Sequence, residues 1–590
     1  MARKQGGPPG RWTRRTGVGV AAALIAAGPL GISPAGASPP APDAAPVDVI
    51  VRTDTASGTP AVRAAVQRLG GTVTRSLDVI TGFAARVPGD AVPALRATGG
   101  VAEVTADAEV RLKGSTWIDD GGKDAPVKNV KKAAGGKVKN GKVDTASLTG
   151  AGIGVAIIDS GISPVVGLNQ PGKVINGPDL SFESQTPGLA QLDTYGHGTH
   201  LAGIIAGSDA GAPGGTGFEG IAPGATLISL KVAAADGASD VSQVIAAIDW
   251  VVTHRTDPGL NIRVLNLSFG TDSVQPALLD PLSFAVEAAW NKGIVVVVSV
   301  GNDGAAATSV TMPAANPYVI AVGAADPNGT DDRADDKVAS FSNRGNVLRH
   351  ADVLAAGRSL VSLRVPGSYI DTTYPAARVT DEAGKQRYFR GSGTSQAAAV
   401  VSGTAALLLQ QRPTLKPDQV KRLLMQSADP LAGADPIAAG SGQVDIAEAA
   451  TLGVPSDAVQ KWPVATGLGK LELSRGSAHV ADSGGAVLTG ERDIFGVAWA
   501  PATWAPLARQ GKAWSSGTWN GTVWSGKDFA GTSWASRTWA PATWTGRSWA
   551  GRSWAGDTWA GRSWAGGTWT GRSWAGGTWA GRSWAGRSWG

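Results

Sequence analysis

Three polar residues lie where apolar stretches of the sequence end or begin, and their types suit nucleophilic catalysis. Asp159 ends the run "GVAIID", His197 lies in "GHGTHLAGIIAG", and Ser395 lies in "GSGTSQAAAVVSG". A serine hydroxyl becomes a nucleophile when a neutral imidazole takes its proton and a carboxylate fixes the tautomer of that imidazole. Together the three residues predict an Asp-His-Ser triad.

Two further features would support that chemistry. Ser395 opens a long predicted helix, whose first backbone N–H groups and positive dipole end would face a developing oxyanion. Asn302, in "VVVSVGNDGA", follows a predicted buried strand, and its amide could donate a second hydrogen bond to that oxyanion. Of the five histidines only His197 and His200 lie in a glycine-rich motif. His200 continues into the apolar helix, which favours a structural role for it.

The elements that must position these residues alternate between strands and helices over residues 148–452. The predicted strands are nearly continuous hydrophobic runs, as expected when both faces of a parallel sheet are buried. They cover residues 154–159, 225–232, 263–268 and 293–302. The stretches between them have helical spacing, so the fold class is α/β with a doubly wound, mainly parallel sheet. Chemistry collects at the carboxyl ends of such strands, where Asp159 lies.

A smaller unit precedes this domain. Residues 38–112 hold, from residue 47 onward, strand and helix patterns in the order βαββαβ, which is the split-βαβ or ferredoxin-like arrangement. Residues 113–147 are rich in lysine and glycine with little apolar periodicity, which predicts a solvated, cleavable linker. We therefore expect a small α+β domain joined by this linker to the larger α/β domain.

The first 37 residues have the pattern of a secretory signal peptide. A basic start is followed by the apolar run "GVGVAAALIAA" at 17–27 and by "AGA" at 35–37, which is a cleavage site before Ser38. The apolar run is shorter than the roughly 20 residues that span a bilayer. We expect a secreted protein with no membrane span once the signal is removed. The chain has no cysteine, which excludes disulfides and Cys-based metal sites.

The last predicted part, residues 499–590, is a five-residue repeat built around tryptophan, and a connecting segment at 453–498 precedes it. Seventeen of the chain's 22 tryptophans lie from Trp499 onward in one phase, with Arg509 and Phe529 in two of the slots. Neither a helix nor a single strand places rings five residues apart on one face. Two arrangements remain open: a self-packing, solenoid-like ladder, which we favour, and a flexible strip that presents its rings to a partner.

The charge of this tail indicates what it would bind. The chain has a net charge of +6, and residues 501–590 carry ten basic and two acidic residues. A cationic, ring-bearing strip suits an anionic polymer, so we expect association with a cell-wall polymer, and we expect no nucleic acid as partner of a secreted chain. The tail also leaves an alternative to an enzyme, namely a catalytically idle wall- or polymer-binding protein.

The motifs "AIIDSGI", "GHGTHLAG", "GND" and "GTSQAA" together resemble those of the subtilases, the subtilisin-like serine endopeptidases, and the ensemble resembles secreted actinobacterial members. The resemblance covers residues 148–452 and implies a subtilisin-like fold that hydrolyses proteins or peptides through an acyl-enzyme. It implies that Asp159 orients His197, that His197 is general base and then acid, and that Ser395 attacks. Asn302 and the Ser395 backbone N–H would hold the oxyanion.

The resemblance also assigns roles outside the triad. The unit at 38–112 resembles the family's propeptide, an inhibitor and folding helper, so we expect a self-processing precursor that is cut between about Leu112 and Asp144. The segment "NLSFG" resembles the lining of the pocket for the residue before the cleaved bond, and "DGAS" resembles the edge strand that pairs with extended substrate. The residues implicated in substrate binding are Gly237, Ala238, Ser268, Phe269 and Gly270.

Two departures from the family pattern bear on the site. "QAAAV" follows Ser395 where the family usually has Met-Ala-Ser-Pro-His, which puts the polar Gln396 beside the nucleophile; the missing residues are not catalytic in the family. The loop after "HGTHLAGIIAG" lacks the family's asparagine-rich calcium loop, and Asp209 and Glu219 are too few hard oxygen ligands on their own. No metal ligand is therefore assigned, no cofactor is expected to be required, and calcium is not supported by this loop.

Overall fold

The computed structural model of the chain contains two hydrophobic cores that define a small and a large domain. The described residues are 46–77, 82–106, 115, 117, 123–127, 147–186, 188–210, 212, 215–330, 332–477, 479–480 and 487–525. The predicted signal peptide and the repeats beyond residue 525 lie outside them. No helix in these ranges is both long and apolar enough to cross a bilayer.

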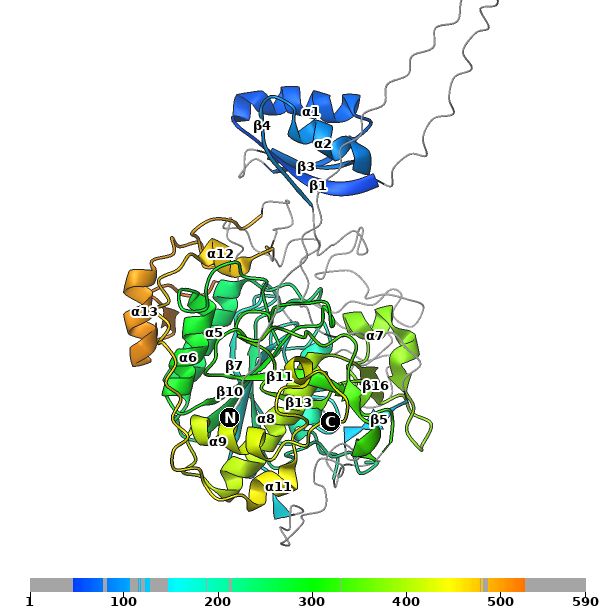
Figure 1. Cartoon of the computed structure of the whole chain (residues 1–590), viewed down its shortest axis with the longest axis vertical. Coiled ribbons are helices and arrows are strands. Elements are labelled where there is room, and N and C mark those ends of the chain that lie inside the picture. Colours follow the sequence, from blue (N-terminus) through cyan, green and yellow to red (C-terminus); the bar gives the residue numbers. More distant parts are fainter. Residues whose placement is uncertain are drawn as a thin grey trace, which may run out of the picture. The chain divides into compact units, whose positions relative to one another are not determined.

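The small domain is an antiparallel sheet with two helices, in the predicted order βαββαβ. Val62 and Val66, one helical turn apart, pack with Val49 and Phe83 from the sheet in its core. The strand order is β2-β3-β1-β4, and both helices cover the same face (Figure 1). The elements are β1 (Pro46–Thr53), α1 (Thr59–Arg68), β2 (Thr72–Leu77), β3 (Gly82–Pro88), α2 (Val92–Arg96) and β4 (Val101–Ala106).

An eight-stranded sheet forms the centre of the large domain. Its order is β12-β11-β10-β9-β6-β8-β7 with β13 paired to β11, and every described pairing is parallel except that of β11 with β12. Strands β6 and β10 are buried along their whole length, as their uninterrupted hydrophobic runs predict. The strands are β6 (Gly154–Asp159), β7 (Val174–Asp179), β8 (Thr226–Lys231), β9 (Ile262–Leu267), β10 (Val295–Ser299), β11 (Ile320–Asp326), β12 (Lys337–Val338) and β13 (Val353–Ala356).

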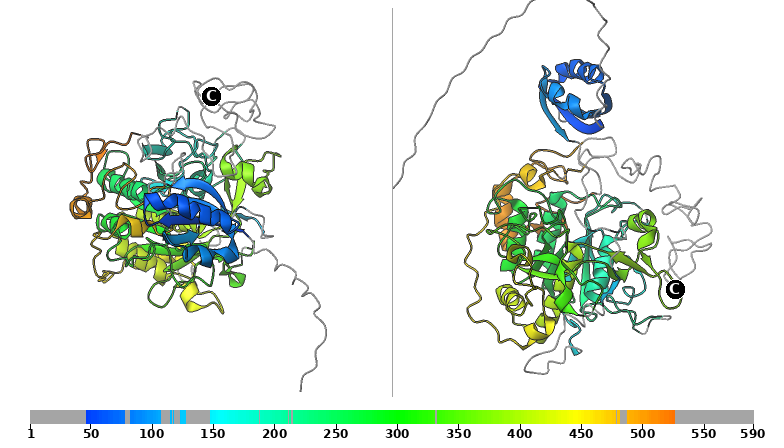
Figure 2. Two further views of the ribbon diagram at one scale, coloured as in Figure 1. Left: turned by 90° about the horizontal axis from the view of Figure 1, so that it is seen from above. Right: turned by 45° about the vertical axis from the view of Figure 1, so that its right-hand side comes forward.

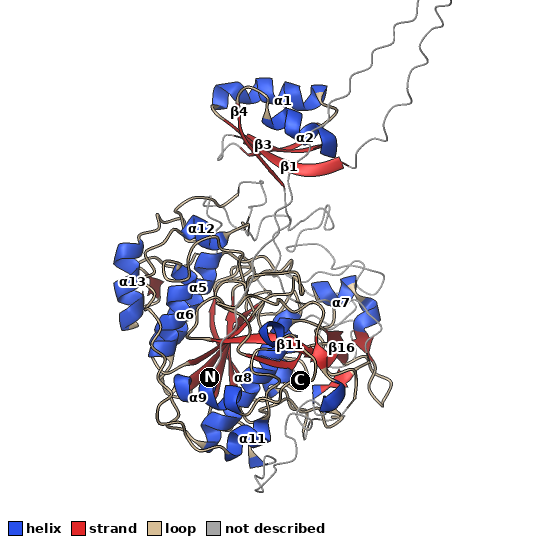
Figure 3. Cartoon of the chain, in the orientation of Figure 1, coloured by secondary structure: helices blue, strands red, loops and turns tan. Residues whose placement is uncertain are grey.

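Helices cover both faces of this sheet, which confirms the doubly wound α/β class. Helices α5 (Val241–His254) and α6 (Pro281–Asn291) pack against each other on one face, and α8 (Thr394–Gln411) lies on the other (Figure 3). Helix α4 (His197–Ala206) packs against α8. Helix α8 is long and almost entirely buried because it crosses β9, β10 and β11. Further helices of the large domain are α9 (Pro417–Gln426), α10 (Pro436–Ala439) and α11 (Ile446–Thr451).

A second, smaller sheet includes part of the predicted linker. Its order is β15-β16-β14-β5, and Ala125 and Val127 in and after β5 are buried. The side chain of Arg390 pairs with Asp124, directly before β5. The linker therefore supplies an edge strand here, where the sequence indicated only solvated chain. The elements are β5 (Ala125–Pro126), β14 (Leu360–Leu363), α7 (Tyr369–Thr373), β15 (Arg378–Val379) and β16 (Tyr388–Gly391).

The first tryptophan repeats pack into the large domain, which differs from the separate tail expected from the sequence. Four rings belong to the same hydrophobic core as the central sheet; they are Trp499, Trp504, Trp514 and Trp519. Helix α13 lies beside α6 (Figures 1 and 2) and carries only Trp504, because Arg509 interrupts the repeat there. The elements are α12 (Leu471–Arg475), α13 (Pro501–Gln510), β17 (Trp514–Ser515) and β18 (Thr518–Trp519).

The cause of this packing lies on helix α5, where Asp249 is buried among apolar residues. The indole N–H groups of Trp504 and Trp519 both donate to Asp249 Oδ2, each at 2.8 Å. The indole of Trp514 donates to the carbonyl of Ala246. Burial raises the pKa of Asp249 to about 7, and the two indole hydrogen bonds oppose that rise. Since a buried carboxyl group needs hydrogen-bond donors, the first repeats complete the large domain.

Candidate active site

Asp159 and His197 are brought together at the carboxyl end of the central sheet. Strand β6 ends at Asp159, and helix α4 begins at His197. His197 Nδ1 lies 2.8 Å and 2.9 Å from the two carboxylate oxygens of Asp159, and both side chains are almost completely buried. Gly196, before the helix, has a φ of 105°, and a Cβ there would lie 2.5 Å from Ser368 Oγ. Glycine is therefore required for the turn that presents the imidazole to the carboxylate.

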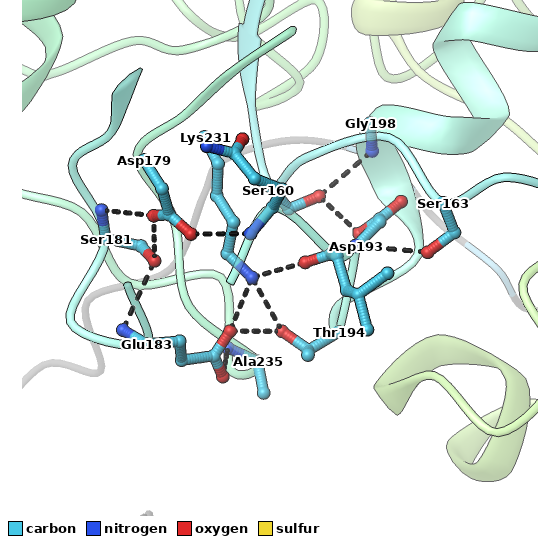
Figure 4. Close-up of polar contacts among 12 residues, drawn as sticks. Ser160, Ser163, Asp179, Ser181, Glu183, Asp193, Thr194, Gly198, Lys231 and Ala235 are labelled. Carbon is cyan, nitrogen blue, oxygen red and sulfur yellow. Dashed lines mark hydrogen bonds and ion pairs between the residues drawn. The ribbon is translucent and has the colours of Figure 1, made fainter. Parts of the chain in front are cut away.

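Buried hydrogen bonds hold Asp159 and the first turn of α4 in place. The N–H of Ser160 donates to Asp159 Oδ1 at 2.8 Å. The hydroxyl of Ser160 donates to Asp193 Oδ1 at 2.8 Å (Figure 4). The N–H of Gly198 donates to Ser160 Oγ at 3.0 Å, and the N–H of Thr199 donates to Asp193 Oδ2 at 2.7 Å. The end of β6 and the start of α4 are thus fixed to each other by one connected network.

A buried ion pair lies next to this network, because Glu183 contacts Thr194, the residue after Asp193. Lys231 Nζ lies 2.6 Å from Glu183 Oε2, and both side chains are buried (Figure 4). Glu183 also accepts hydrogen bonds from Thr194 Oγ1 at 2.6 Å and from the N–H of Ala235 at 3.1 Å. Its hydrogen bonds compensate for the desolvation of the two charges. The pair connects β8, the loop before α4 and the chain that leads into residues 236–239.

The two histidines of the glycine-rich motif have opposite electrostatic environments. Burial by itself lowers the pKa of His197, but the charge and hydrogen bond of Asp159, together with the charge of Asp193, raise it above its ordinary value. Burial lowers the pKa of His200 to about 3, and its Nε2 lies 3.0 Å from the carbonyl oxygen of Phe389. His200 is therefore a neutral, hydrogen-bonded part of the core, whereas His197 can change its charge.

Ser395 is the second residue of α8, and Asn302 lies beside the start of the same helix. The N–H and hydroxyl of Thr394 donate to Asn302 Oδ1 at 2.8 Å and 3.0 Å. Asn302 Nδ2 and Ser395 Oγ are buried and have no hydrogen-bond partner within the described part of the chain. Buried polar atoms are rarely left unpaired. A donor and a hydroxyl are therefore available together for a bound molecule.

Of the residues expected to bind substrate, Ser268 lies next to the candidate nucleophile. Its Oγ is 3.5 Å from the carbonyl oxygen of Ser395, and the adjacent Phe269 is buried. Residues 236–239 follow β8 outside any regular strand, and the N–H of Gly237 closes a turn by bonding to the carbonyl of Ala234 at 2.9 Å. No contact described for these residues joins the turn to Ser395.

Two residues that the sequence placed in the linker also lie at this site. Ser115 Oγ is 3.1 Å from His197 Nε2 and donates to Gln396 Oε1 at 2.8 Å. Trp117 is 3% exposed, and its ring packs edge-on against His200. One feature of the sequence could have indicated that this part of the linker is buried, because Trp117 is the one tryptophan of the predicted linker. The Ser115 hydroxyl thus contacts His197 Nε2, the ring nitrogen that would have to accept the proton of a nucleophilic serine.

In the loop considered for calcium, one oxygen of the Asp209 carboxylate has partners within the protein, whereas Oδ1 is buried without a hydrogen-bond partner among the described residues. Asp209 Oδ2 accepts a hydrogen bond from the N–H of Thr216 at 2.7 Å and lies 3.5 Å from an Arg387 nitrogen. Among the described residues, no three His, Asp or Glu side chains are grouped so that they could hold a metal ion.

The site lies in the part of the chain that matches known proteins. Residues 150–455 match the family model described as "Subtilase family", and residues 37–107 match one described as "Putative peptidase inhibitor domain". "Serine protease AprX" of Bacillus subtilis is 40% identical over 314 residues, which is 52% of this chain and 67% of that protein. "Subtilisin DY" of Bacillus licheniformis is 34% identical over 316 residues, 53% of this chain and 96% of that protein.

A solved structure is also similar. Fervidolysin from Fervidobacterium pennivorans, described as a keratinolytic enzyme related to subtilisin, aligns with a TM-score of 0.45 and 24% identity. The alignment covers 70% of this chain and 62% of fervidolysin.

Proposed function

Since the chain belongs to the subtilase family and is a serine endopeptidase, we propose that Asp159, His197 and Ser395 carry out its hydrolysis of peptide bonds. The observation that carries this proposal is the contact of the His197 ring with the Asp159 carboxylate, together with a Ser395 hydroxyl at the start of α8 that has no hydrogen-bond partner among the described residues. The alternative of an idle polymer-binding protein is not favoured, because the relatives are proteases and every group that the reaction needs is present.

The reaction follows from the roles of the three side chains. Ser395 Oγ attacks the carbonyl carbon of the substrate while His197 Nε2 takes the hydroxyl proton. Asp159 keeps the other ring proton on Nδ1 and stabilises the imidazolium. His197 then gives its proton to the leaving amine as the C–N bond breaks, which leaves an acyl-enzyme, and a water activated in the same way releases the acyl group. No cofactor takes part in these steps.

We place the oxyanion between two donors. They are Asn302 Nδ2 and the backbone N–H of Ser395, and Thr394 holds the opposite end of the Asn302 amide. Such donors stabilise the developing charge without having to reorganise. We assign the acyl side of the substrate to the residues expected from the sequence, which are Gly237, Ala238, Ser268, Phe269 and Gly270.

The pH dependence of the reaction tests this assignment. Only the neutral imidazole can act as base, so kcat/KM should fall as pH drops through the pKa of His197. Because that pKa is raised, the midpoint of the fall should lie above 6.5, the ordinary value for histidine. The measurement is kcat/KM of the processed enzyme on a peptide p-nitroanilide from about pH 5 to about pH 9, a range that extends to both sides of the ordinary histidine pKa.

The control is Asp159→Asn, which removes the carboxylate charge that raises the pKa. Its midpoint should move to lower pH, and its rate should fall about 10⁴-fold, the loss known for the same exchange in another serine protease, because the imidazole adopts the wrong tautomer. A wild-type midpoint well below 6.5, or an unchanged midpoint in Asp159→Asn, would contradict the assignment of His197 as base.

We propose that the chain is made as a precursor whose small domain inhibits the enzyme. The match of residues 37–107 to a peptidase inhibitor domain supports this proposal. The proposed parts are a signal peptide at 1–37, the inhibitor domain at 38–112, a linker at 113–147 and the peptidase domain at 148–452. The expected cut between Leu112 and Asp144 falls largely outside the described residues.

Residues 38–112, added to the processed enzyme, should inhibit hydrolysis of the p-nitroanilide at equimolar concentration. The unit has a core of its own, so it can be prepared alone. Phe83→Ala should remove inhibition because Phe83 is fully buried and its loss costs about 3–5 kcal/mol in a small domain. Arg68→Ala, at an exposed position, should leave inhibition intact. Full activity in the presence of an excess of the folded wild-type unit would rule out this role.

We propose that the enzyme acts outside the cell and that its basic tail binds an anionic cell-wall polymer. The signal-like residues 1–37 and the charge of residues 501–590 support this location.

A further inference from the structure

Trp117 fills an aromatic pocket beside the proposed triad. Its ring centroid lies 5.2 Å from that of His200 and 5.5 Å from that of Phe389. Ile370 and Ala377 complete a buried cluster with it, separate from the core of the central sheet. Trp117 comes from a lysine- and glycine-rich segment, yet it is as buried in the large domain as a core residue.

The backbone at Gly391 makes room for this ring. A Cβ on Gly391 would lie 2.5 Å from Cζ3 of Trp117, so any larger residue there would narrow the pocket. The indole nitrogen of Trp117 is buried without a hydrogen-bond partner in the described part of the chain. The pocket therefore holds the ring by shape and apolar contact, and it suits an aromatic side chain without requiring an indole.

Ser115 connects this pocket to the proposed base. Its hydroxyl contacts His197 Nε2 at 3.1 Å, and the ring of Trp117 meets the ring of His197 edge-on, with 6.1 Å between centroids. Two residues close together in the chain thus reach the same histidine. Residues 115 and 117 therefore lie in the site as two alternate residues of a bound peptide would.

These residues lie on the side of the site from which the amine would leave. The contacts described for Ser115 and Trp117 come from α4, from β16, from α7 and Ala377 after it, and from Gln396. None of them comes from residues 236–239 or 268–270, to which we assign the acyl side. His197 Nε2, which Ser115 contacts, is also the atom that protonates the leaving amine.

We propose that the Trp117 pocket is the subsite for the third residue after the cleaved bond, and that it selects an aromatic side chain there. Ser115 then occupies the position of the first residue after that bond, and Trp117 occupies the subsite from within the chain. This inference rests on the proposed function, because a leaving-group side exists only if Ser395 cleaves a peptide.

A positional scan of substrates tests the subsite. Internally quenched peptides share one acyl-side sequence and carry a single tryptophan at the first, second, third or fourth position after the cleaved bond, with alanine elsewhere. Processed Trp117→Ala enzyme should hydrolyse the third-position peptide with a kcat/KM about tenfold above that of the all-alanine peptide. Phenylalanine at the third position should give a similar gain. Wild-type enzyme is assayed in parallel. Where processing has removed residue 117 it should show the same gain as the variant, and where residue 117 is retained the gain should be smaller, because Trp117 fills the pocket.

Gly391→Ala provides the complementary test. Its added methyl group narrows the pocket, so the ratio between the third-position peptide and the all-alanine peptide should fall towards one. The ratio is compared within one enzyme, which cancels any effect on the triad. Equal kcat/KM for both peptides in Trp117→Ala and wild type, or a preference at a different position, would overturn the inference. A p-nitroanilide with the same acyl-side residues monitors the triad alone, and its failure to react would overturn the proposed function instead.

Discussion

Replacing Ser395 with alanine should abolish hydrolysis of a peptide p-nitroanilide and leave the fold intact. The nucleophile is lost, and the expected decrease in kcat is about 10⁶-fold, the value already known for subtilisin itself. Folding should be unaffected because Ser395 Oγ makes no hydrogen bond within the described structure. The variant should also accumulate as uncut precursor, which mass measurement of the secreted protein would detect.

The matched control for this substitution is Ser402→Ala on the same helix. Ser402 is also buried, but its hydroxyl donates to Asn266 Oδ1 at 3.0 Å. Its loss should cost about 1 kcal/mol of the free energy of unfolding and leave kcat near the wild-type value. To compare rates, both variants are processed by added wild-type enzyme and then purified away from it. Wild-type turnover in Ser395→Ala would disprove its role as nucleophile.

Ending the chain after Gly453 should prevent the large domain from folding, whereas ending it after Ser525 should not. The shorter chain loses Trp504 and Trp519, which are 1% and 0% exposed and donate to the buried Asp249. It also loses Arg475, whose ion pair with Asp240 is fully buried. Leaving the buried charge of Asp240 without Arg475 costs about 3–5 kcal/mol, against a total stability of about 5–15 kcal/mol, and Asp249 loses both indole donors as well.

The two truncations are compared by soluble yield, thermal unfolding and p-nitroanilide hydrolysis. The chain that ends after Ser525 should match the full chain in all three, and it should be released from wall preparations if the remaining repeats bind the wall. A folded, active protein ending after Gly453 would contradict the role of the first repeats in the core. Retention of the Ser525 truncation on walls at the full-chain level would contradict the anchoring role of the later repeats.

The sequence predicts the central sheet well because strands buried on both faces need continuous hydrophobic runs. The strand expected at 154–159 has the same bounds in the structure, whereas the run at 293–302 contains β10 only over Val295–Ser299. Its ends are not visible in the sequence, because the residues beyond them are also buried or turn-forming. Asp159 and His197 were identifiable because short motifs place them at the junctions of elements.

Long-range partners explain what the sequence could not predict. The phase of the tryptophans indicates that the rings share a role, but the hydrogen-bond acceptor of Trp504 and Trp519 is Asp249, which lies 255 and 270 residues earlier in the chain. Nothing in the repeat itself identifies that carboxylate. In the same way, Ser115 and Trp117 sit in a segment without periodicity, and only the packing of the large domain shows that Trp117 has a pocket.

The most direct measurement is to treat the processed enzyme with diisopropyl fluorophosphate and to locate the modification by mass spectrometry of its peptides. The label should lie on Ser395 alone, one per molecule, and its rate of incorporation should equal the rate of inactivation. The reaction should slow as pH falls through the pKa of His197, because the protonated imidazole cannot activate the serine. Complete inactivation with Ser395 unmodified, or undiminished hydrolysis with Ser395 fully labelled, would contradict the account.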